Sequence, residues 1–417
     1  MSKRKIYFLP QYIGPLKHFE RFIPYLKDTY DIGFLFISGD DVRRRELIEY
    51  CKNNQYSYSV IEKGLKGKSK FHIPFFTPIK NRYDHSMACR SFLENVKPDK
   101  IIATKSRYPY DTIFKEANKM NIDTIVLQWS VGLLTRQMFG TTRKKTLVRN
   151  TYHFLLEIFM RLLDVFCGEQ RFRYTPAAPK KIGVFTFTEE DAHNYIKEGL
   201  DPNVVHIVGP VEFQVTHELK TKIDSNLIFR KELFNKYGLT EDKIKIFVNL
   251  FRFHVIPLPK KYKMTNEEHV NHHLSLFKMI RSVFPREEAD IILRIHPRES
   301  EVRAIYEPYK KLGVKIYFNE SKTEELVCLS DLYVGDPTSS VNYMVLASNI
   351  PAIFTNFSNL TAINNLGKNF YIKHIVTDEK EFVSMLKQFK MSTLTKQYDN
   401  TNINLQSVDK TIELINL

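Results

Sequence analysis

The sequence predicts an α/β protein with two domains, each built around a doubly wound parallel sheet. Three observations lead to this prediction. At 417 residues, the chain exceeds the size that one hydrophobic core usually supports. Short apolar runs alternate with longer helical stretches, which is typical of parallel βαβ units. The alternation occurs in two series along the chain.

The first series begins within ten residues of the first Met. Its expected strands are 5–9, 32–37, 58–61, 100–104 and 124–128. Helical stretches between them are expected at 16–27, 42–53 and 111–120. Turn residues such as Pro98-Asp99 and Asn121 to Asp123 separate these elements.

The second series starts at residue 181, after a stretch in which no strand is expected. Its expected strands are 181–187, 204–208, 243–250, 290–295, 314–318, 331–334 and 351–354. Gly209-Pro210 follows a strand and precedes a polar stretch that ends near Asp224, which marks a junction. We therefore expect the first domain to span residues 1–220 and the second to span residues 221–380.

Two strands of the second series end in groups that suit a phosphate. The strand 290–295 runs into Arg294-Ile-His-Pro297, and the strand 331–334 runs into Gly335-Asp-Pro-Thr-Ser-Ser340. Ligands of open parallel sheets bind at the carboxyl ends of the strands. We therefore expect both clusters to face one anionic ligand.

The side chains in these clusters are hydrogen-bond donors. Arg294 offers a planar fork of donors, and His296 can donate one hydrogen bond and carry charge near neutral pH. Thr338, Ser339 and Ser340 offer hydroxyls, and the helix expected after them would point its first N–H groups at the same place. The alternative is an ordinary helix cap after a turn, since Ser and Thr are common caps.

The joint pattern resembles the nucleotide-binding half of GT-B glycosyltransferases. It is most similar to the CDP-glycerol glycerophosphotransferase group and to bacterial capsule sialyl- and Kdo-transferases, whose motifs match residues 294–297, 330–340 and 351–354. The resemblance implies two Rossmann-like domains facing a cleft, with residues 381–417 as helices that pack back on the first domain. It also implies that Arg252 lies beside the donor and that His296 acts in catalysis at the leaving phosphate.

The acceptor is expected in the first domain. Gln11 to His18 forms a glycine-proline loop that opens a helix after the first strand, and we expect Gly14 to line the cleft. His18 could act as general base on an acceptor hydroxyl; the alternative is a helix histidine without a chemical role. The stretch 127–132 resembles a turn in which glycerophosphate polymerases carry a catalytic His, but this chain has Ser130 there. That departure weighs against glycerophosphate chemistry.

Charge and composition constrain the partners. The net charge is +15, but Lys and Arg are spread along the chain without a recognised nucleic-acid module, so we expect no nucleic-acid partner. A basic run at 143–149 precedes an apolar helix at 151–166 with one narrow polar stripe, which suits an anchor lying on an anionic membrane surface. The alternative is a helix buried in the first domain or at a dimer contact.

Metal and export signals are missing from the sequence. The four cysteines show no metal-ligand spacing, and no Asp-x-Asp motif stands at a strand end. No signal peptide is recognised, so we expect a cytoplasmic protein that is peripheral on the inner face of the cytoplasmic membrane.

The sequence thus predicts an inverting, metal-independent glycosyltransferase that needs no cofactor. It would move a sugar, with a CMP-activated acidic sugar as first choice, from a nucleotide donor to a surface polysaccharide or lipid-linked glycan. The alternatives are a CDP-glycerol-type glycerophosphotransferase, a nucleotide-sugar 2-epimerase with acid and base carboxylates in the cleft, and a noncatalytic glycan-binding scaffold.

Overall fold

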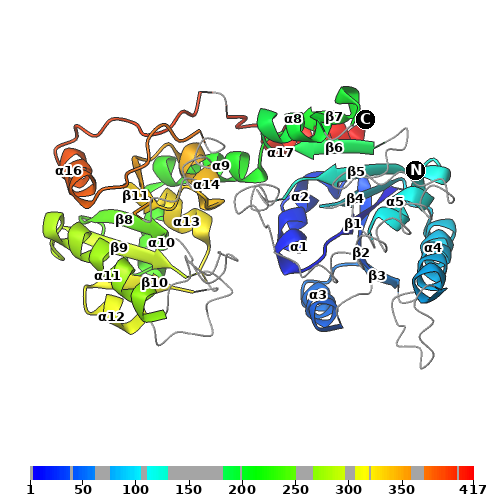
Figure 1. The fold of residues 1–417 in the computed structure, drawn as a ribbon, viewed down its shortest axis with the longest axis horizontal. Helices are drawn as coiled ribbons and strands as arrows, with labels where there is room; N and C mark the ends of the chain where they lie inside the picture. Colours follow the sequence, from blue (N-terminus) through cyan, green and yellow to red (C-terminus); the bar gives the residue numbers. More distant parts are fainter. Residues whose placement is uncertain are drawn as a thin grey trace, which may run out of the picture. The chain divides into compact units, whose positions relative to one another are not determined.

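The computed structural model describes two compact units (Figure 1). The residues it describes are 3–37, 41–61, 76–104, 110–129, 182–197, 200–249, 266–295, 306–318, 321–357, 371–401 and 403–417. Unit 1 contains the described residues up to Trp129, those from 182 to Val211, and Ser407–Leu417. Unit 2 contains the described residues from Glu212 to Gln406.

Unit 1 is built on a parallel sheet with the strand order β3-β2-β1-β4-β5-β6-β7. Its strands are β1 (Arg4–Leu9), β2 (Tyr30–Ile37), β3 (Tyr58–Ile61), β4 (Lys100–Ala103), β5 (Asp123–Leu127), β6 (Ile182–Thr186) and β7 (Val205–Ile207). Its helices are α1 (Ile13–Glu20), α2 (Ile23–Leu26), α3 (Asp41–Asn53), α4 (Phe76–Val96), α5 (Tyr110–Lys119), α8 (Glu189–Lys197), the 3-10 turn η1 (Pro202–Val204) and α17 (Ser407–Asn416). Every residue of β4 is buried, as expected of a parallel strand that is covered on both faces.

Unit 2 is built on a second parallel sheet, with the strand order β10-β9-β8-β11-β12. Its strands are β8 (Ile244–Asn249), β9 (Ala289–Arg294), β10 (Val314–Tyr317), β11 (Leu332–Gly335) and β12 (Ala352–Phe354). Its helices are α9 (Val211–Ser225), whose first residue still belongs to unit 1, α10 (Leu227–Lys236), α11 (Asn266–Val283), α12 (Glu307–Lys310), α13 (Thr323–Cys328), α14 (Val341–Ser348) and α16 (Glu379–Lys390).

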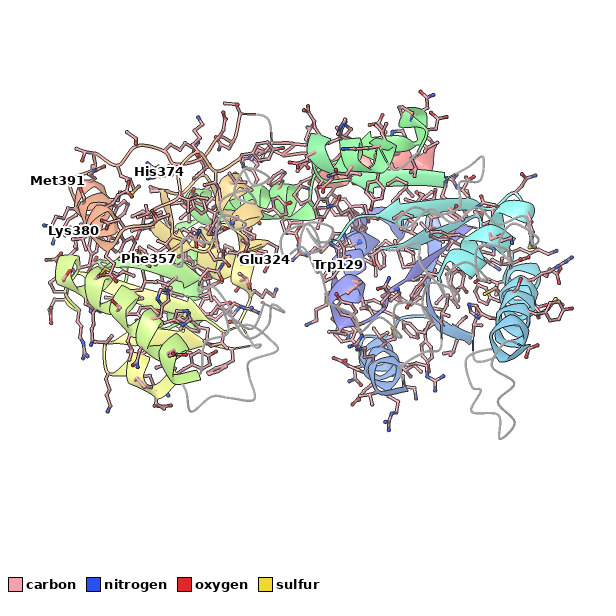
Figure 2. All side chains as sticks on the ribbon, viewed as in Figure 1. Trp129, Glu324, Phe357, His374, Lys380 and Met391 are labelled. Carbon is pink, nitrogen blue, oxygen red and sulfur yellow. The ribbon has the colours of Figure 1, made fainter. Side chains whose placement is uncertain are left out.

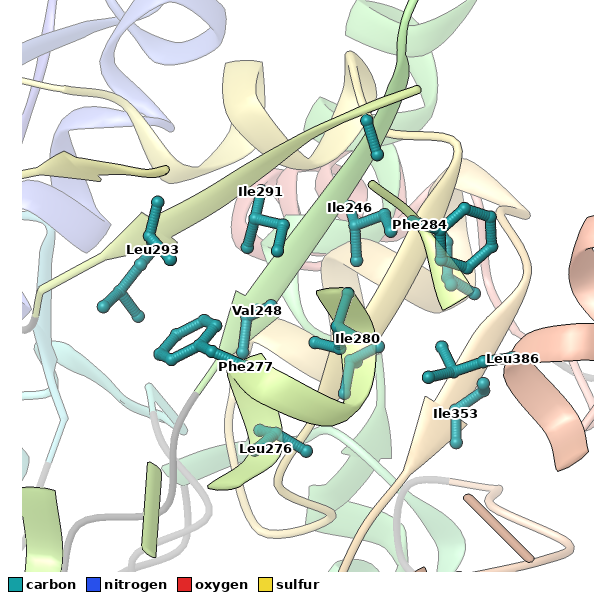
Figure 3. Close-up of a cluster of buried hydrophobic side chains, with 14 of the residues drawn as sticks. Ile246, Val248, Leu276, Phe277, Ile280, Phe284, Ile291, Leu293, Ile353 and Leu386 are labelled. Atoms are coloured by element: carbon teal, nitrogen blue, oxygen red, sulfur yellow. The ribbon is translucent and has the colours of Figure 1, made fainter. Parts of the chain in front are cut away.

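One face of the unit 2 sheet forms a hydrophobic core with α11 and α16 (Figure 3). The side chains that meet there include Ile246 and Val248 of β8, Ile291 and Leu293 of β9, Phe277 and Ile280 of α11, and Leu386 of α16. Side chains alternate between the two faces of a strand. Asn249 and Arg294, which directly follow Val248 and Leu293, therefore point to the opposite face.

The predicted fold class is confirmed, because both units are α/β and both sheets are parallel. The C-terminal helices differ from the prediction for residues 381–417. In unit 1, α17 packs against the start of β2, and the Tyr30 hydroxyl there donates to the Ile415 carbonyl at 3.3 Å. In contrast, α16 belongs to unit 2, where Phe382 and Leu386 are buried in the core that α11 also lines. The chain passes from unit 1 to unit 2 after Val211, the first residue of α9, near the junction expected between residues 210 and 240.

Candidate functional site

Three residues stand in one row at the carboxyl edge of the unit 2 sheet. Gly335 of β11 pairs with Asn249 of β8. Val248 pairs with Leu293 of β9, which places the following residue, Arg294, beside Asn249. Because β9 and β11 flank β8, their ends are about 10 Å apart. Both predicted clusters thus begin at the edge where open parallel sheets bind ligands.

The segment after β11 is a tight turn held by Asp336. This buried carboxylate accepts the backbone N–H of Thr338 at 2.8 Å and the Thr338 hydroxyl at 2.8 and 2.9 Å. The Ser339 hydroxyl oxygen accepts the backbone N–H of Val341 at 3.3 Å. Ser340 is exposed, and neither its hydroxyl nor its backbone N–H hydrogen-bonds within the described residues. These two donors are what the start of α14 offers to a ligand.

A buried hydrogen-bond network fixes this turn from below. The Tyr333 hydroxyl donates to Asn342 Oδ1 at 2.8 Å and accepts from Asn249 Nδ2 at 3.0 Å. Asn342 Nδ2 in turn donates to the Asp336 carbonyl at 3.1 Å. The network joins the ends of β8 and β11 to α14, so the turn cannot shift without breaking buried hydrogen bonds.

Gly335 is required by this network. A Cβ at this position would lie 2.2 Å from the Tyr333 hydroxyl oxygen and 2.3 Å from its Cζ. Real carbon contacts are about 3.5–4.0 Å. Only glycine leaves room for the phenol to cross the strand end and reach both asparagines.

Arg294 is held at the same edge by the segment before α13. Its Nε donates to the carbonyl of buried Ser321 at 3.4 Å. The first turn of α13 is anchored through Glu325, which accepts from Lys236 Nζ and from the Tyr237 hydroxyl, both at 2.5 Å. Burial alone would raise the pKa of the Glu325 carboxyl, but these hydrogen bonds outweigh it and the pKa lies below its ordinary value. The segment that positions the guanidinium is therefore fixed by a charged, half-buried cluster.

The structure separates the predicted phosphate ligands. Arg294 and Ser340 stand at the carboxyl edge with groups that suit an anion. Thr338 directs its hydroxyl proton at Asp336, so it holds the turn in this structure, and its donation to a phosphate stays a prediction. Two further predicted residues, Arg252 and His296, lie outside the described residues.

A second cluster stands at the carboxyl edge of unit 1. Trp129, which follows β5 and is labelled in Figure 2, makes an edge-to-face contact with Tyr12, with 5.4 Å between ring centroids. Gly14, predicted to line a cleft, lies in the first turn of α1 directly against both rings. A Cβ there would meet Tyr12 at 3.1 Å and Trp129 at 3.2 Å. Ser130, the other residue expected on the acceptor side, lies outside the described residues.

Gln128 positions Trp129. Its Nε2 donates to Asp191 Oδ2 at 3.0 Å, and its Oε1 accepts the backbone N–H of Phe187 at 3.0 Å. The Thr188 hydroxyl also donates to Asp191 Oδ2 at 3.0 Å. Burial raises the pKa of the Asp191 carboxyl, and these hydrogen bonds oppose the rise. The end of β5 is thereby tied to the first turn of α8.

The structure speaks against His18 as the general base. The side chain is buried, with its ring 5.6 Å from that of Phe22. Burial, and then the charge of Arg21, lowers the pKa of His18 to about 3. A general base works best when its pKa is near the operating pH. A neutral, buried imidazole with so low a pKa would be a weak base.

Sequence reasoning missed the residues that act by positioning others. Asn249, Tyr333 and Asn342 carry no chemistry of their own, and nothing in their spacing distinguishes them from ordinary core residues. The Tyr-x-Gly spacing of Tyr333 and Gly335, which places both on one face of a strand, is the one signal that the sequence offers.

Within the described ranges, no group of three or more His, Cys, Asp or Glu side chains could hold a metal ion. None of the helices in the same ranges is long and apolar enough to cross a membrane. The predicted membrane-surface helix at 151–166 lies outside the described residues.

The chain was compared with known proteins. Neither a family model nor a curated protein sequence matches it. Solved structures do match over nearly the whole length. The UDP-GlcNAc 2-epimerase from Methanocaldococcus jannaschii aligns with a TM-score of 0.59 at 14% identity, covering 99% of each chain.

Two more structures show the same likeness. The UDP-GlcNAc 2-epimerase from Neisseria meningitidis, bound to UDP-GlcNAc, aligns with a TM-score of 0.59 at 11% identity, covering 99% of this chain and 100% of that one. MurG from Acinetobacter baumannii aligns with a TM-score of 0.53 at 10% identity, covering 99% of each chain. The two-domain GT-B fold is therefore shown, while the narrower resemblance to CDP-glycerol, sialyl- and Kdo-transferases stays a prediction.

Proposed function

We propose that this chain is an enzyme that binds a nucleotide sugar at the carboxyl edge of the unit 2 sheet. The observation that carries the proposal is the placement of Arg294 at the end of β9 and of Ser340 at the start of α14, after β11, so that both follow strands that flank β8, with the turn after β11 held by a buried network. An arginine fork binds phosphate through charge-assisted hydrogen bonds. The start of α14 favours negative charge through its N–H groups. Proteins with this fold whose structures are named as UDP-GlcNAc complexes support the same assignment.

The same donors would assist the reaction. When the bond between sugar and phosphate breaks, negative charge grows on the leaving phosphate, and fixed donors stabilise it without having to reorganise. Removing one such donor in known enzymes costs roughly 10²- to 10³-fold in rate. The Tyr333 network would contribute by keeping Ser340 in place.

Two reactions fit such a donor site. Epimerisation at C2 is favoured by the likeness to several structures named UDP-GlcNAc 2-epimerase. Glycosyl transfer is favoured by the likeness to MurG and by the aromatic pair at the edge of unit 1. In the transfer, an acceptor hydroxyl would attack the anomeric carbon, lose its proton to a base, and displace the nucleotide with its bonding electron pair.

The finer parts of the proposal rest on the sequence. A CMP-activated acidic sugar is an alternative donor to UDP-GlcNAc, on the Arg-x-His-Pro pattern. An inverting, metal-independent transfer to a surface polysaccharide or lipid-linked glycan, on the cytoplasmic side of an anionic membrane, fits the net charge of +15. Glycerophosphate transfer and a noncatalytic scaffold remain the competing possibilities.

A thermal-shift screen tests the donor site. UDP, CMP, CDP and GDP and their sugar conjugates are added to the full chain, because a ligand bound only by the folded state raises its melting temperature. We expect one nucleotide to give a shift that Arg294→Ala abolishes and Arg294→Lys weakens, since lysine keeps the charge but not the fork. Arg286→Ala is the matched control, because Arg286 is exposed and precedes β9 at the amino edge of the same sheet. Equal stabilisation of wild type and Arg294→Ala would refute the site.

Product analysis then separates the reactions. The full chain is incubated with the nucleotide sugar that gave the shift, with and without a glycan acceptor. Formation of the 2-epimer without acceptor would establish the epimerase. Nucleotide release that depends on the acceptor would establish the transferase. Binding without either product would indicate a noncatalytic scaffold.

A further inference from the structure

The aromatic pair in unit 1 has features that a purely structural contact does not need. Trp129 is the single tryptophan of the chain, and both it and Tyr12 are only partly buried. Gly14 lies so close that even a methyl group would press on both rings, at 3.1 and 3.2 Å. Helix interiors favour Ala over Gly by about 1 kcal/mol. A glycine in the first turn of α1 thus gives up helix stability and leaves the rings where they are.

Strand order places this pair above β4. Tyr12 follows β1 and Trp129 follows β5, and β4 runs between these two strands. Strands on either side of a third are about 10 Å apart, yet the ring centroids are only 5.4 Å apart. The rings therefore lean toward each other across the end of β4, where Thr104 stands.

Polar groups without partners surround the same strand ends. Thr104 is 6% exposed, and its buried hydroxyl oxygen has no hydrogen-bond partner within the described residues. Gln11 follows β1, and its buried Nε2 also has no partner in the part of the chain that the structure describes. His18, one helical turn after Gly14 on the same face of α1, packs against Phe19 and Phe22, and its Nε2 likewise has no partner within the described residues. Most buried polar groups in proteins are hydrogen-bonded, so the two exceptions that directly follow neighbouring strands, Gln11 after β1 and Thr104 after β4, indicate groups kept for a ligand.

We propose that this edge of unit 1 binds an uncharged sugar ring, which lies against Trp129 and Tyr12 and hydrogen-bonds with Gln11 and Thr104. The apolar face of a sugar ring suits an aromatic surface, and its hydroxyls can accept from the Gln11 amide and exchange hydrogen bonds with the Thr104 hydroxyl. The unpartnered groups are neutral, which favours an uncharged ligand over a phosphate or carboxylate. This inference rests on the proposed function, in which the bound sugar ring would be the acceptor. Binding of an acceptor sugar would favour glycosyl transfer over epimerisation.

The single tryptophan gives a direct readout. The nucleotide-free full chain is titrated with N-acetylglucosamine, glucose, N,N′-diacetylchitobiose and maltose while Trp129 emission is recorded. We expect a saturable change with at least one of these sugars. Saturation-transfer NMR of the sugar protons is the second measurement, because it does not depend on a change in emission.

Three variants locate the site. Gln11→Leu and Thr104→Val each remove one hydrogen-bonding group, and a loss of about 0.5–1.5 kcal/mol would weaken binding about 2- to 10-fold. Gly14→Ala should weaken binding by displacing the rings, although it favours helix α1 and so retains the fold. Thr216→Val is the matched control and should bind like wild type, because the Thr216 hydroxyl is also buried without a partner among the described residues but lies in unit 2.

The outcomes separate this inference from the donor site. If the nucleotide shift is retained but no sugar gives a saturable signal by either measurement, the sugar-ring site is wrong and the donor site stands. If the sugars bind and no nucleotide does, the proposed function fails while the unit 1 site stands. Sugar binding that Gln11→Leu, Thr104→Val and Gly14→Ala all leave unchanged would also overturn the proposal.

Discussion

Gly335→Ala is the sharpest test of how the donor site is built. The new Cβ would lie 2.2 Å from the Tyr333 hydroxyl oxygen and 2.3 Å from Cζ, so the ring must move by more than about 1 Å to reach a normal contact. That movement breaks the hydrogen bonds of 2.8 Å to Asn342 and 3.0 Å from Asn249. Leaving two buried amide groups unsatisfied costs about 1–3 kcal/mol each, so we expect a loss of about 2–6 kcal/mol.

The assay compares two glycines that each lie beneath a tyrosine. Gly33→Ala would place a Cβ 2.6 Å from Tyr7, which pairs with Gly33 across β1 and β2. Tyr7 is only half-buried, and its hydroxyl makes no hydrogen bond within the described residues, so overpacking of about 1–3 kcal/mol is the whole cost. Urea unfolding followed by circular dichroism measures the free energy of unfolding of both variants. Trp129 fluorescence reports the unfolding of unit 1 separately.

Tyr333→Phe isolates the polar part of the effect, because it removes the hydroxyl without a steric conflict. We expect both Gly335→Ala and Tyr333→Phe to weaken nucleotide binding, since the turn that carries Ser340 loses its support. The reasoning is refuted if Gly335→Ala is no more destabilising than Gly33→Ala, or if it leaves the nucleotide shift intact.

Three further predictions follow from hydrogen bonds and burial. The pKa of His18 is about 3 in the folded state and 6.5 ordinarily, so between pH 3 and pH 6.5 only the unfolded state takes up this proton. The contribution of His18 to stability is therefore full above pH 6.5 and falls below it by up to about 1.4 kcal/mol per pH unit. His18→Phe should reduce this slope in urea unfolding measured at several pH values. Thr338→Ala should cost about 1 kcal/mol by removing the hydroxyl bound to Asp336, and Thr338→Ser should cost nothing in the same titration; equal losses would contradict the turn assignment. Gln128→Leu removes one of the two side-chain donors to the Asp191 carboxylate and the acceptor of the Phe187 N–H, so it should cost about 1.5–3 kcal/mol with a shift in Trp129 emission, and an unchanged spectrum would show that Gln128 does not position the indole.

The sequence predicted the fold class because alternation of apolar runs and helical stretches is a local signal. Every expected strand, from 5–9 to 351–354, became a strand of a parallel sheet. The assignment of the last helices was less secure. Both α16 and α17 have one apolar stripe, and a stripe does not say which sheet will cover it. The unit to which each helix belongs depends on tertiary contacts, those of Phe382 for α16 and those of Ile415 for α17.

The sequence predicted where the candidate site lies, but not which contacts hold its residues in place. Arg294 could be placed because it directly follows an apolar run, and strand ends meet at one edge. The sequence shows that Thr338 has a hydroxyl, but not that its proton is directed at Asp336. It likewise shows a histidine at residue 18, but not that the imidazole is buried beside Phe22. Hydrogen-bond direction and burial depend on neighbours distant in sequence, which no local pattern contains.

Unit 1 is assembled from segments that are far apart in the chain. The β1 to β7 sheet is encoded before unit 2, but α17, whose Ile415 meets Tyr30, is encoded after it. A ribosome therefore releases the described elements of unit 2 while the first sheet still lacks one of its helices. During synthesis, the described elements of unit 2 can therefore reach their native packing before unit 1 does, because the first sheet waits for the buried side chains Val408 and Ile415 of α17.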